Sequence, residues 1–168
     1  ETAFIVPTTD ANRFDLRWFT PACEVDLCGH ATLAAAHTLI EQNLVDVDSP
    51  IRFQTRSGEL PCTRSGSRIM LDFPATTANA DVDRDTAGAL VAALGIREAV
   101  VMQSAFDLVV VVEDANVVES LRPDFYLLGQ IETRGVMVTA KSQRPGIDFV
   151  SRFFAPRCRI NEDPVTGS

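Results

Sequence analysis

Basic residues are scarce in this sequence. The chain has 15 Lys and Arg against 23 Asp and Glu, and its net charge is −8. Such an acidic chain is a poor partner for nucleic acid, whose phosphates require a Lys/Arg surface, and for an anionic membrane surface. A small anionic metabolite is still a suitable partner, because clustered backbone N–H groups can bind an anion on an acidic protein.

Long apolar runs are missing as well. Residues 108–112 form the longest candidate, which is the length of a strand and far below the roughly 18–20 residues that span a bilayer. The first residues lack the basic start and apolar stretch of a signal peptide. Four cysteines are too few and too widely spread for a disulfide framework. We therefore expect reduced thiols in a cytoplasmic protein.

The composition that is present, 46% hydrophobic and 23% charged, is typical of a globular protein. In the first half, alternation predicts a strand over 13–18, and an Ala- and Leu-rich segment predicts a helix over 30–42. That helix is apolar nearly all round, so we expect other structure to enclose it. A meander of strands is predicted to follow, at 51–56, 59–64 and 68–73.

Residues 75–82 are the best linker candidate. Beyond them the sequence predicts a helix over 83–94 that Gly95 ends. Further strands are predicted at 98–102, 108–112, 135–139 and 149–153, with short helices at 116–121 and 123–128. The expected fold is α+β with two lobes, 1–78 and 79–168, each a curved, mostly antiparallel sheet.

The run Cys28-Gly29-His30-Ala31-Thr32 lies where a loop enters the first predicted helix. Gly29 lets the backbone approach a ligand closely, and the unpaired N–H groups of a first helical turn favour a carboxylate. On these grounds alone a plain turn at Gly29 and a helix cap at His30 are equally open.

A metal site near this run would recruit Cys23, Cys28, His30 and His37. Their spacing matches no common zinc pattern, and the sequence places no acidic residue to complete the set. We therefore expect no metal here, and we expect His37 in the core or at its boundary.

The end of the sequence, Glu162 to Ser168, has two carboxylates followed by Pro164, which removes a backbone donor. Gly167 and Ser168 could present N–H and hydroxyl groups to an anion. An acidic surface turn is the simpler interpretation. Glu1 would ordinarily be considered an exposed, frayed terminal residue.

Together the motifs of the chain resemble the PhzF family of phenazine biosynthesis-like proteins, whose fold is similar to that of diaminopimelate epimerase. The motifs occur in family order across the whole chain and lie at 1–5, 17–21, 24–25, 27–34, 53–60, 71–74, 151–156 and 162–168. The resemblance implies that each lobe's sheet surrounds a central helix. It also implies that sequence is missing at both ends, that the second lobe is incomplete, and that the chain alone is inactive and unstable.

The resemblance assigns roles to residues of both lobes. It implies that Glu1 is the general acid/base and that His30 and Asp163 are further catalytic residues. It also implies that the substrate binds at Gly29, Gly167 and Ser168, with no metal or organic cofactor.

The expected activity is that of an isomerase that relocates a proton on a small carboxylate-bearing metabolite. Two alternatives stay open. One is an amino-acid epimerase or racemase that uses Cys28, and the other is a non-catalytic ligand-binding protein of the same fold. The sequence does not identify the substrate, and it leaves a homodimer open.

Overall fold

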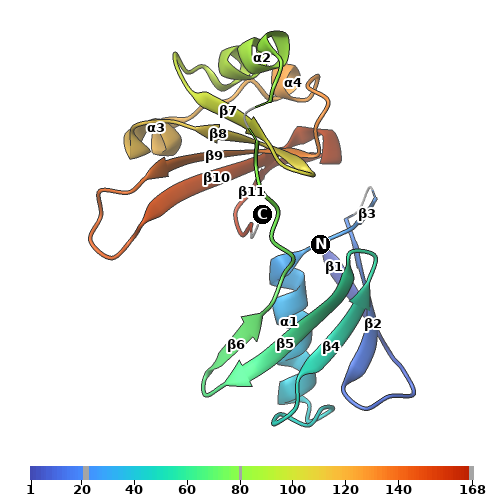
Figure 1. The fold of residues 1–168 in the computed structure, drawn as a ribbon. Coiled ribbons are helices and arrows are strands. Elements are labelled where there is room, and N and C mark those ends of the chain that lie inside the picture. The colour runs from blue at the N-terminus through green and yellow to red at the C-terminus, as the bar shows by residue number, and fades with distance from the viewer. Residues whose placement is uncertain (21–22, 80, 167–168) are drawn as a thin grey trace. The chain divides into compact units, whose positions relative to one another are not determined.

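The computed structural model describes residues 1–20, 23–79 and 81–166 (Figure 1). Their contacts divide the chain into two units. Unit 1 contains Glu1–Ala75 together with Val165 and Thr166, and unit 2 contains Thr76–Pro164. The division therefore falls at 75/76 rather than at the predicted 78/79, and the last described residues return to unit 1.

Unit 1 is a sheet with one long helix. Its strands are β1 (Thr2–Pro7), β2 (Arg13–Phe19), β3 (Glu24–Val25), β4 (Ile51–Thr55), β5 (Gly58–Ser65) and β6 (Arg68–Leu71), and its helix is α1 (Gly29–Glu41). The strand order is β1-β2-β4-β5-β6, with β3 paired to β2. The β2–β4 pair is parallel, and the other neighbours are antiparallel.

Helix α1 contacts both outer strands of this order, β1 and β6, so the sheet curves around the helix (Figure 1). Its buried face packs on a core that includes Leu16, Trp18 and Phe53. The opposite face is not enclosed by the described residues: Leu33 is 41% exposed and His37 is exposed. The predictions of an enclosed helix and of a core position for His37 are therefore wrong for the described chain.

Unit 2 is a second sheet with shorter helices. Its elements are α2 (Arg84–Leu94), β7 (Val100–Gln103), β8 (Asp107–Val111), α3 (Ala115–Ser120), α4 (Phe125–Leu128), β9 (Gly135–Lys141), β10 (Phe149–Ala155), the 3₁₀ turn η1 (Pro156–Cys158) and β11 (Ile160–Asp163). The order is β11-β10-β9-β8-β7, and only β8 and β9 are parallel among these pairs. No described helix is long and apolar enough to cross a membrane.

The two faces of the second sheet differ. One face packs with α2, α3 and α4 into a core that contains Leu108, Val110, Val138 and Phe154. Side chains alternate along a strand, so the intervening residues point to the other face, which we call the open face. It is formed by Val100, Met102, Val109, Val111, Met137, Thr139, Phe149, Ser151 and Phe153.

Helix α2 shows how local sequence sets these boundaries. The Asp83 carboxylate accepts hydrogen bonds from the backbone N–H groups of Asp85 and Thr86, which caps the helix start. Gly95 ends the helix in the left-handed conformation at φ 67°.

Candidate active site

The start of α1 holds two of the predicted site residues. Cys28 is the N-cap and has an extended backbone, and Gly29 and His30 form the first turn. The buried Thr32 hydroxyl donates to the carbonyl of Cys28 at 2.7 Å, which fixes this turn. The side chains of Cys28 and His30 are therefore presented from a rigid helix end rather than from a free loop.

Glu1, which directly precedes β1, lies beside His30. Its Oε2 atom is 3.0 Å from His30 Nε2, although 29 positions separate the two residues. The Glu1 side chain is 14% exposed and the His30 side chain 32%. Glu1 as a whole residue is exposed, as expected, but contact with His30 of α1 partly buries its side chain, so the carboxylate is held in place rather than frayed.

The other ring nitrogen of His30 has a different partner. Nδ1 lies 2.9 Å from the backbone carbonyl of Val165, in the predicted motif at the chain end. A carbonyl only accepts hydrogen bonds, so this contact assigns a proton to Nδ1. One further proton is then needed between Nε2 and the Glu1 carboxyl group, and either residue can carry it. Glu1 and His30 therefore form a proton-sharing pair.

Cys28 completes a compact group. Its Sγ atom is 3.6 Å from His30 Nε2, and the residue is 7% exposed. Ligand atoms of Glu1, Cys28 and His30 all lie within 4.8 Å of one another, close enough to hold a metal ion. The sequence identified no acidic residue near Cys28 and His30, and the structure places Glu1 in that position.

Gly29 has a packing role that the sequence did not reveal. A Cβ atom at this position would come 3.2 Å from Cε2 of Phe73, tighter than an ordinary contact. The ring of Phe73 therefore lies against the first turn of α1.

Several residues of the family-like motifs stabilise the loop before Cys28. Glu24 pairs with Arg17 and Arg56, and Arg56 also reaches Asp26 at 3.3 Å. The hydrogen bond from Arg17 lowers the pKa of the Glu24 carboxyl group below its usual value. The hydroxyl of Ser57 donates to the carbonyl of Asp26 at 2.7 Å. These contacts fix the loop that leads into the helix.

Glu162 and Asp163 lie in unit 2 on β11, so the interpretation of this segment as a surface turn is wrong for both. Strand pairing joins Asp163 to Phe153 of β10. The turn is confined to Pro164 and Val165. The structure brings Glu1, Cys28 and His30 together within unit 1, whereas Asp163 belongs to the other unit. The predicted Gly167 and Ser168 lie outside the described residues.

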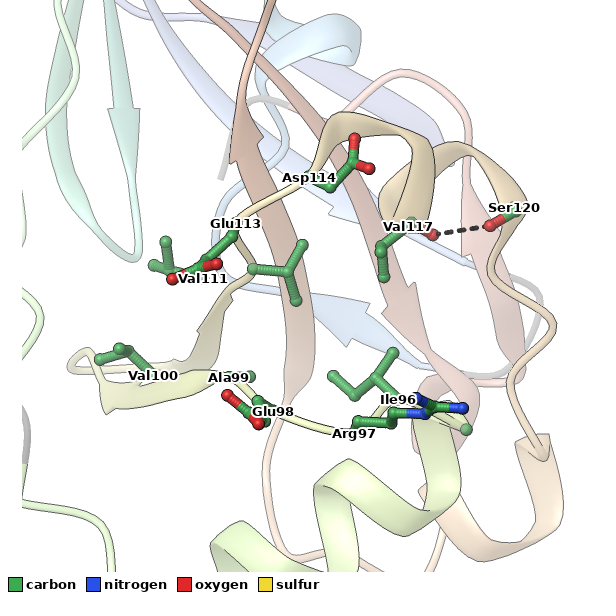
Figure 2. Close-up of a pocket in the computed structure, with 12 residues that line it drawn as sticks. Ile96, Arg97, Glu98, Ala99, Val100, Val111, Glu113, Asp114, Val117 and Ser120 are labelled. Carbon is green, nitrogen blue, oxygen red and sulfur yellow. Dashed lines mark hydrogen bonds between the residues drawn. The ribbon is translucent and has the colours of Figure 1, made fainter.

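Unit 2 contains a hollow of about 660 Å³ between β7, β8 and α3 (Figure 2). Its lining includes the acidic residues Glu98, Glu113 and Asp114 and the apolar residues Val111 and Val117 (Figure 2). Asp114 already caps α3 by accepting from a backbone N–H group. The described lining contains none of the predicted site residues, so the group in unit 1 is the candidate active site.

Comparison with known proteins assigns the chain to a family. The sequence model described as phenazine biosynthesis-like protein (PhzC-PhzF) matches residues 1–168. A protein named as an uncharacterized isomerase from Pseudomonas aeruginosa is 51% identical over 168 residues, which are the whole chain and 61% of that relative. One of the same description from Halalkalibacterium halodurans is 45% identical, over the whole chain and 62% of its length. The chain thus spans about three fifths of these relatives.

Solved structures agree on the fold. A PhzF family protein from Enterococcus faecalis is 39% identical with a TM-score of 0.81, covering 99% of this chain and 61% of that one. A probable proline racemase from Agrobacterium radiobacter has a TM-score of 0.59 at 13% identity, over 91% of this chain and 53% of that one, which is a likeness of fold alone. By sequence and by fold, the chain belongs to the PhzF family of phenazine biosynthesis-like proteins.

Proposed function

We propose that the protein is an isomerase that relocates a proton on a small carboxylate-bearing metabolite, with Glu1 and His30 as the proton-transferring pair. The observation that carries this proposal is the 3.0 Å contact between Glu1 Oε2 and His30 Nε2, with Nδ1 held by the Val165 carbonyl. The names of the bacterial relatives, which describe isomerases, support the reaction class.

The geometry supports this chemistry in two ways. A general acid/base must be able both to give and to accept a proton, and a carboxyl–imidazole pair that shares one proton can do both. The Val165 carbonyl keeps the ring in one orientation, so Nε2 always faces Glu1. In this proposal Glu1 abstracts the substrate proton, and His30 stabilises or relays it.

In this proposal, other residues bind the substrate. The N–H groups at the start of α1, around Gly29, hold the substrate carboxylate through the positive end of the helix dipole. Asp163, Gly167 and Ser168 complete the site from the chain-end motif, as the resemblance implies. No metal or organic cofactor takes part in the proposed reaction.

Hydrogen exchange tests the proposal without knowledge of the product. The whole protein is incubated in D₂O with a panel of small 2-amino, 2-hydroxy and unsaturated carboxylic acids, and proton NMR follows the loss of C–H signals. For a true substrate, Glu1→Gln should slow exchange by about 10²–10⁴-fold, the usual contribution of a general base. Glu41→Gln, at the exposed end of the same helix, is the matched control. Exchange that persists in Glu1→Gln would exclude Glu1 as the base.

A second candidate is an epimerase or racemase in which the Cys28 thiol is one of two acid/base groups. The 3.6 Å separation of Cys28 Sγ and His30 Nε2 favours it, because a nearby imidazole can take up the thiol proton. This mechanism requires inversion of a stereocentre and loss of activity in Cys28→Ala. Full activity of Cys28→Ala would remove it, and a lack of exchange with any acid would favour a non-catalytic ligand-binding protein.

A further inference from the structure

The side chains of Glu1, Cys28 and His30 offer three different ligand types at one point: a carboxylate oxygen, a sulfur and an imidazole nitrogen. We propose that this group binds a thiophilic divalent cation, with Zn²⁺ as the reference ion, and that the cation inhibits the protein by replacing the shared proton. Cation binding itself does not depend on the proposed isomerase activity, since it can be measured without turnover.

The separation of Glu1 and His30 is close to that of two ligands of a tetrahedral ion, and Cys28 lies within reach. A Zn²⁺ about 2.0 Å from nitrogen and oxygen and about 2.3 Å from sulfur holds nitrogen and oxygen about 3.3 Å apart, and nitrogen and sulfur about 3.5 Å apart. In the structure His30 Nε2 lies 3.0 Å from Glu1 Oε2 and 3.6 Å from Cys28 Sγ. Glu1 and His30 are therefore almost in place. Cys28 Sγ, which also lies 3.8 Å from His30 Nδ1, is beside the imidazole ring and must turn about the Cα–Cβ bond to reach the ion.

His30 is already oriented as a metal ligand. A metal-bound imidazole commonly donates its second N–H group to a backbone carbonyl, which fixes the tautomer and the ring plane. The Nδ1 contact with the Val165 carbonyl is such a hydrogen bond. It leaves Nε2 to face Glu1 Oε2, 3.0 Å away, with Cys28 Sγ beside the ring.

The cation and the proton exclude each other. When Nε2 and the Glu1 carboxylate both bind the ion, no proton can lie between them, and the pair loses its acid/base function. Three protein ligands leave the fourth position of a tetrahedral ion open to water or to a substrate carboxylate. The group therefore fits reversible inhibition that a chelator relieves.

The other cysteine and histidine near the motif provide matched controls. Cys23 is exposed, and His37 lies exposed on the same helix as His30. Neither belongs to the group whose ligand atoms lie within 4.8 Å. Substitution of Cys23 or His37 removes a residue of the same type as a proposed ligand but leaves all three proposed ligands unchanged.

Titration of the whole, chelator-treated protein with Co²⁺ tests the site directly. We expect visible ligand-field bands together with a near-ultraviolet thiolate-to-metal charge-transfer band, and displacement of Co²⁺ by Zn²⁺ gives the affinity. Cys28→Ser should abolish the charge-transfer band and weaken Zn²⁺ binding about 100-fold or more, since loss of even an outer hydrogen-bond partner of a ligand costs 10–100-fold. Cys23→Ser and His37→Ala should bind as the unchanged protein does.

Glu1→Gln provides a second variant that does not alter a core position, and it should also weaken Zn²⁺ binding. Fluorescence of Trp18, the single, fully buried tryptophan of the chain, verifies that each variant keeps a folded unit 1. Absence of the charge-transfer band, or equal weakening by Cys23→Ser, would overturn the proposal. Cation binding without hydrogen exchange would contradict only the isomerase, and exchange without cation binding only the metal site.

Discussion

Arg152 holds Glu162 by two parallel hydrogen bonds, from Nε to Oε1 and from Nη2 to Oε2, each 2.7 Å long. The remaining nitrogen, Nη1, donates to the carbonyls of Val118 and Leu121 at 3.1 and 3.0 Å. The guanidinium group also lies 5.0 Å from the ring centroid of Phe154. One side chain of β10 thus joins β11 to the end of α3. Because β11 also carries Asp163, Arg152 positions a predicted site residue without being one.

Removal of this guanidinium group should destabilise unit 2. Arg152→Ala leaves two backbone carbonyls and one carboxylate without their donor, so we expect a loss of about 2–4 kcal/mol in the free energy of unfolding. Arg152→Lys should recover only part of the loss, because an ammonium group cannot reproduce the planar fork. Urea denaturation of the whole protein, followed by far-ultraviolet circular dichroism, gives the values.

The control for this prediction is Arg144→Ala. Arg144 and Glu119 form an ion pair in which the side chains are 62% and 45% exposed, so its loss should cost less than about 1 kcal/mol. Equal costs for Arg144→Ala and Arg152→Ala would contradict the role given to Arg152.

The same pair should make unit 2 sensitive to acid. The hydrogen bond from Arg152 lowers the pKa of Glu162 below its ordinary 4.5. A carboxyl group with a lowered pKa in the folded state stabilises the fold above its unfolded pKa, and the contribution is lost as the pH falls through the folded value. We therefore expect Glu162→Gln to cost stability at neutral pH and to cost little well below pH 4.5.

The size of this effect is limited by solvent. The Glu162 side chain is 38% exposed, so screening should hold the pH-dependent part to about 1 kcal/mol. Denaturation midpoints over an acid-to-neutral pH series test the prediction. In an Arg152→Ala background, Glu162→Gln should have a much smaller pH-dependent effect, since only the charge of Arg122 then still lowers the pKa of Glu162. A cost of Glu162→Gln that is the same at every pH would contradict the assignment.

Gly135 should tolerate no side chain. A Cβ atom there would lie 2.2 Å from Cζ of Phe153, a buried residue whose ring covers the glycine. Gly135→Ala must displace this ring, at an expected cost of about 1–3 kcal/mol. The cost should shrink in a Phe153→Leu background, since the clash is then removed.

Gly88→Ala is the matched control, because nothing lies within 4 Å of a Cβ atom at this position in α2. Alanine is the better helix former, so this variant should gain up to about 1 kcal/mol. Similar stabilities for Gly88→Ala and Gly135→Ala would show that close contact with Phe153 does not limit position 135.

Much of the fold follows from local signals. Helix α2 was predictable because Asp83 caps its start and Gly95 ends it, and the meander from β4 to β6 because turns at Gly58 and Gly66 separate alternating segments. Strand β11 was not predictable: it is short and polar, a proline follows it, and its pairing with β10 includes a register shift. Such a strand exists only because a distant partner offers it hydrogen bonds.

Part of the candidate site could likewise be predicted from local sequence, and part could not. Cys28 and His30 are close in sequence, so their proximity at a helix start could be anticipated. Chain periodicity gave no reason to place Glu1 beside them, and only the family resemblance did. The Val165 carbonyl was missed because a backbone acceptor leaves no mark in a pattern of side chains. The exposure of Leu33 was missed because apolar composition does not reveal how much of a helix its neighbours cover.

The open face of the second sheet carries the last prediction, which concerns the chain of residues 1–168 by itself. Phe149 is 66% exposed and Val100 58%, and beside Phe149 lies a hollow of about 440 Å³ that Val111 and Met137 also line. A contiguous apolar surface on a sheet favours association. We expect this chain to aggregate or to unfold without cooperativity, as judged by sedimentation and thermal melting. Phe149→Ser should reduce aggregation, whereas Tyr126→Ser, at a position of α4 that is 76% exposed, should not. A cooperative melt of the unchanged chain as a monomer would refute this expectation, because the open face would then be stable in water.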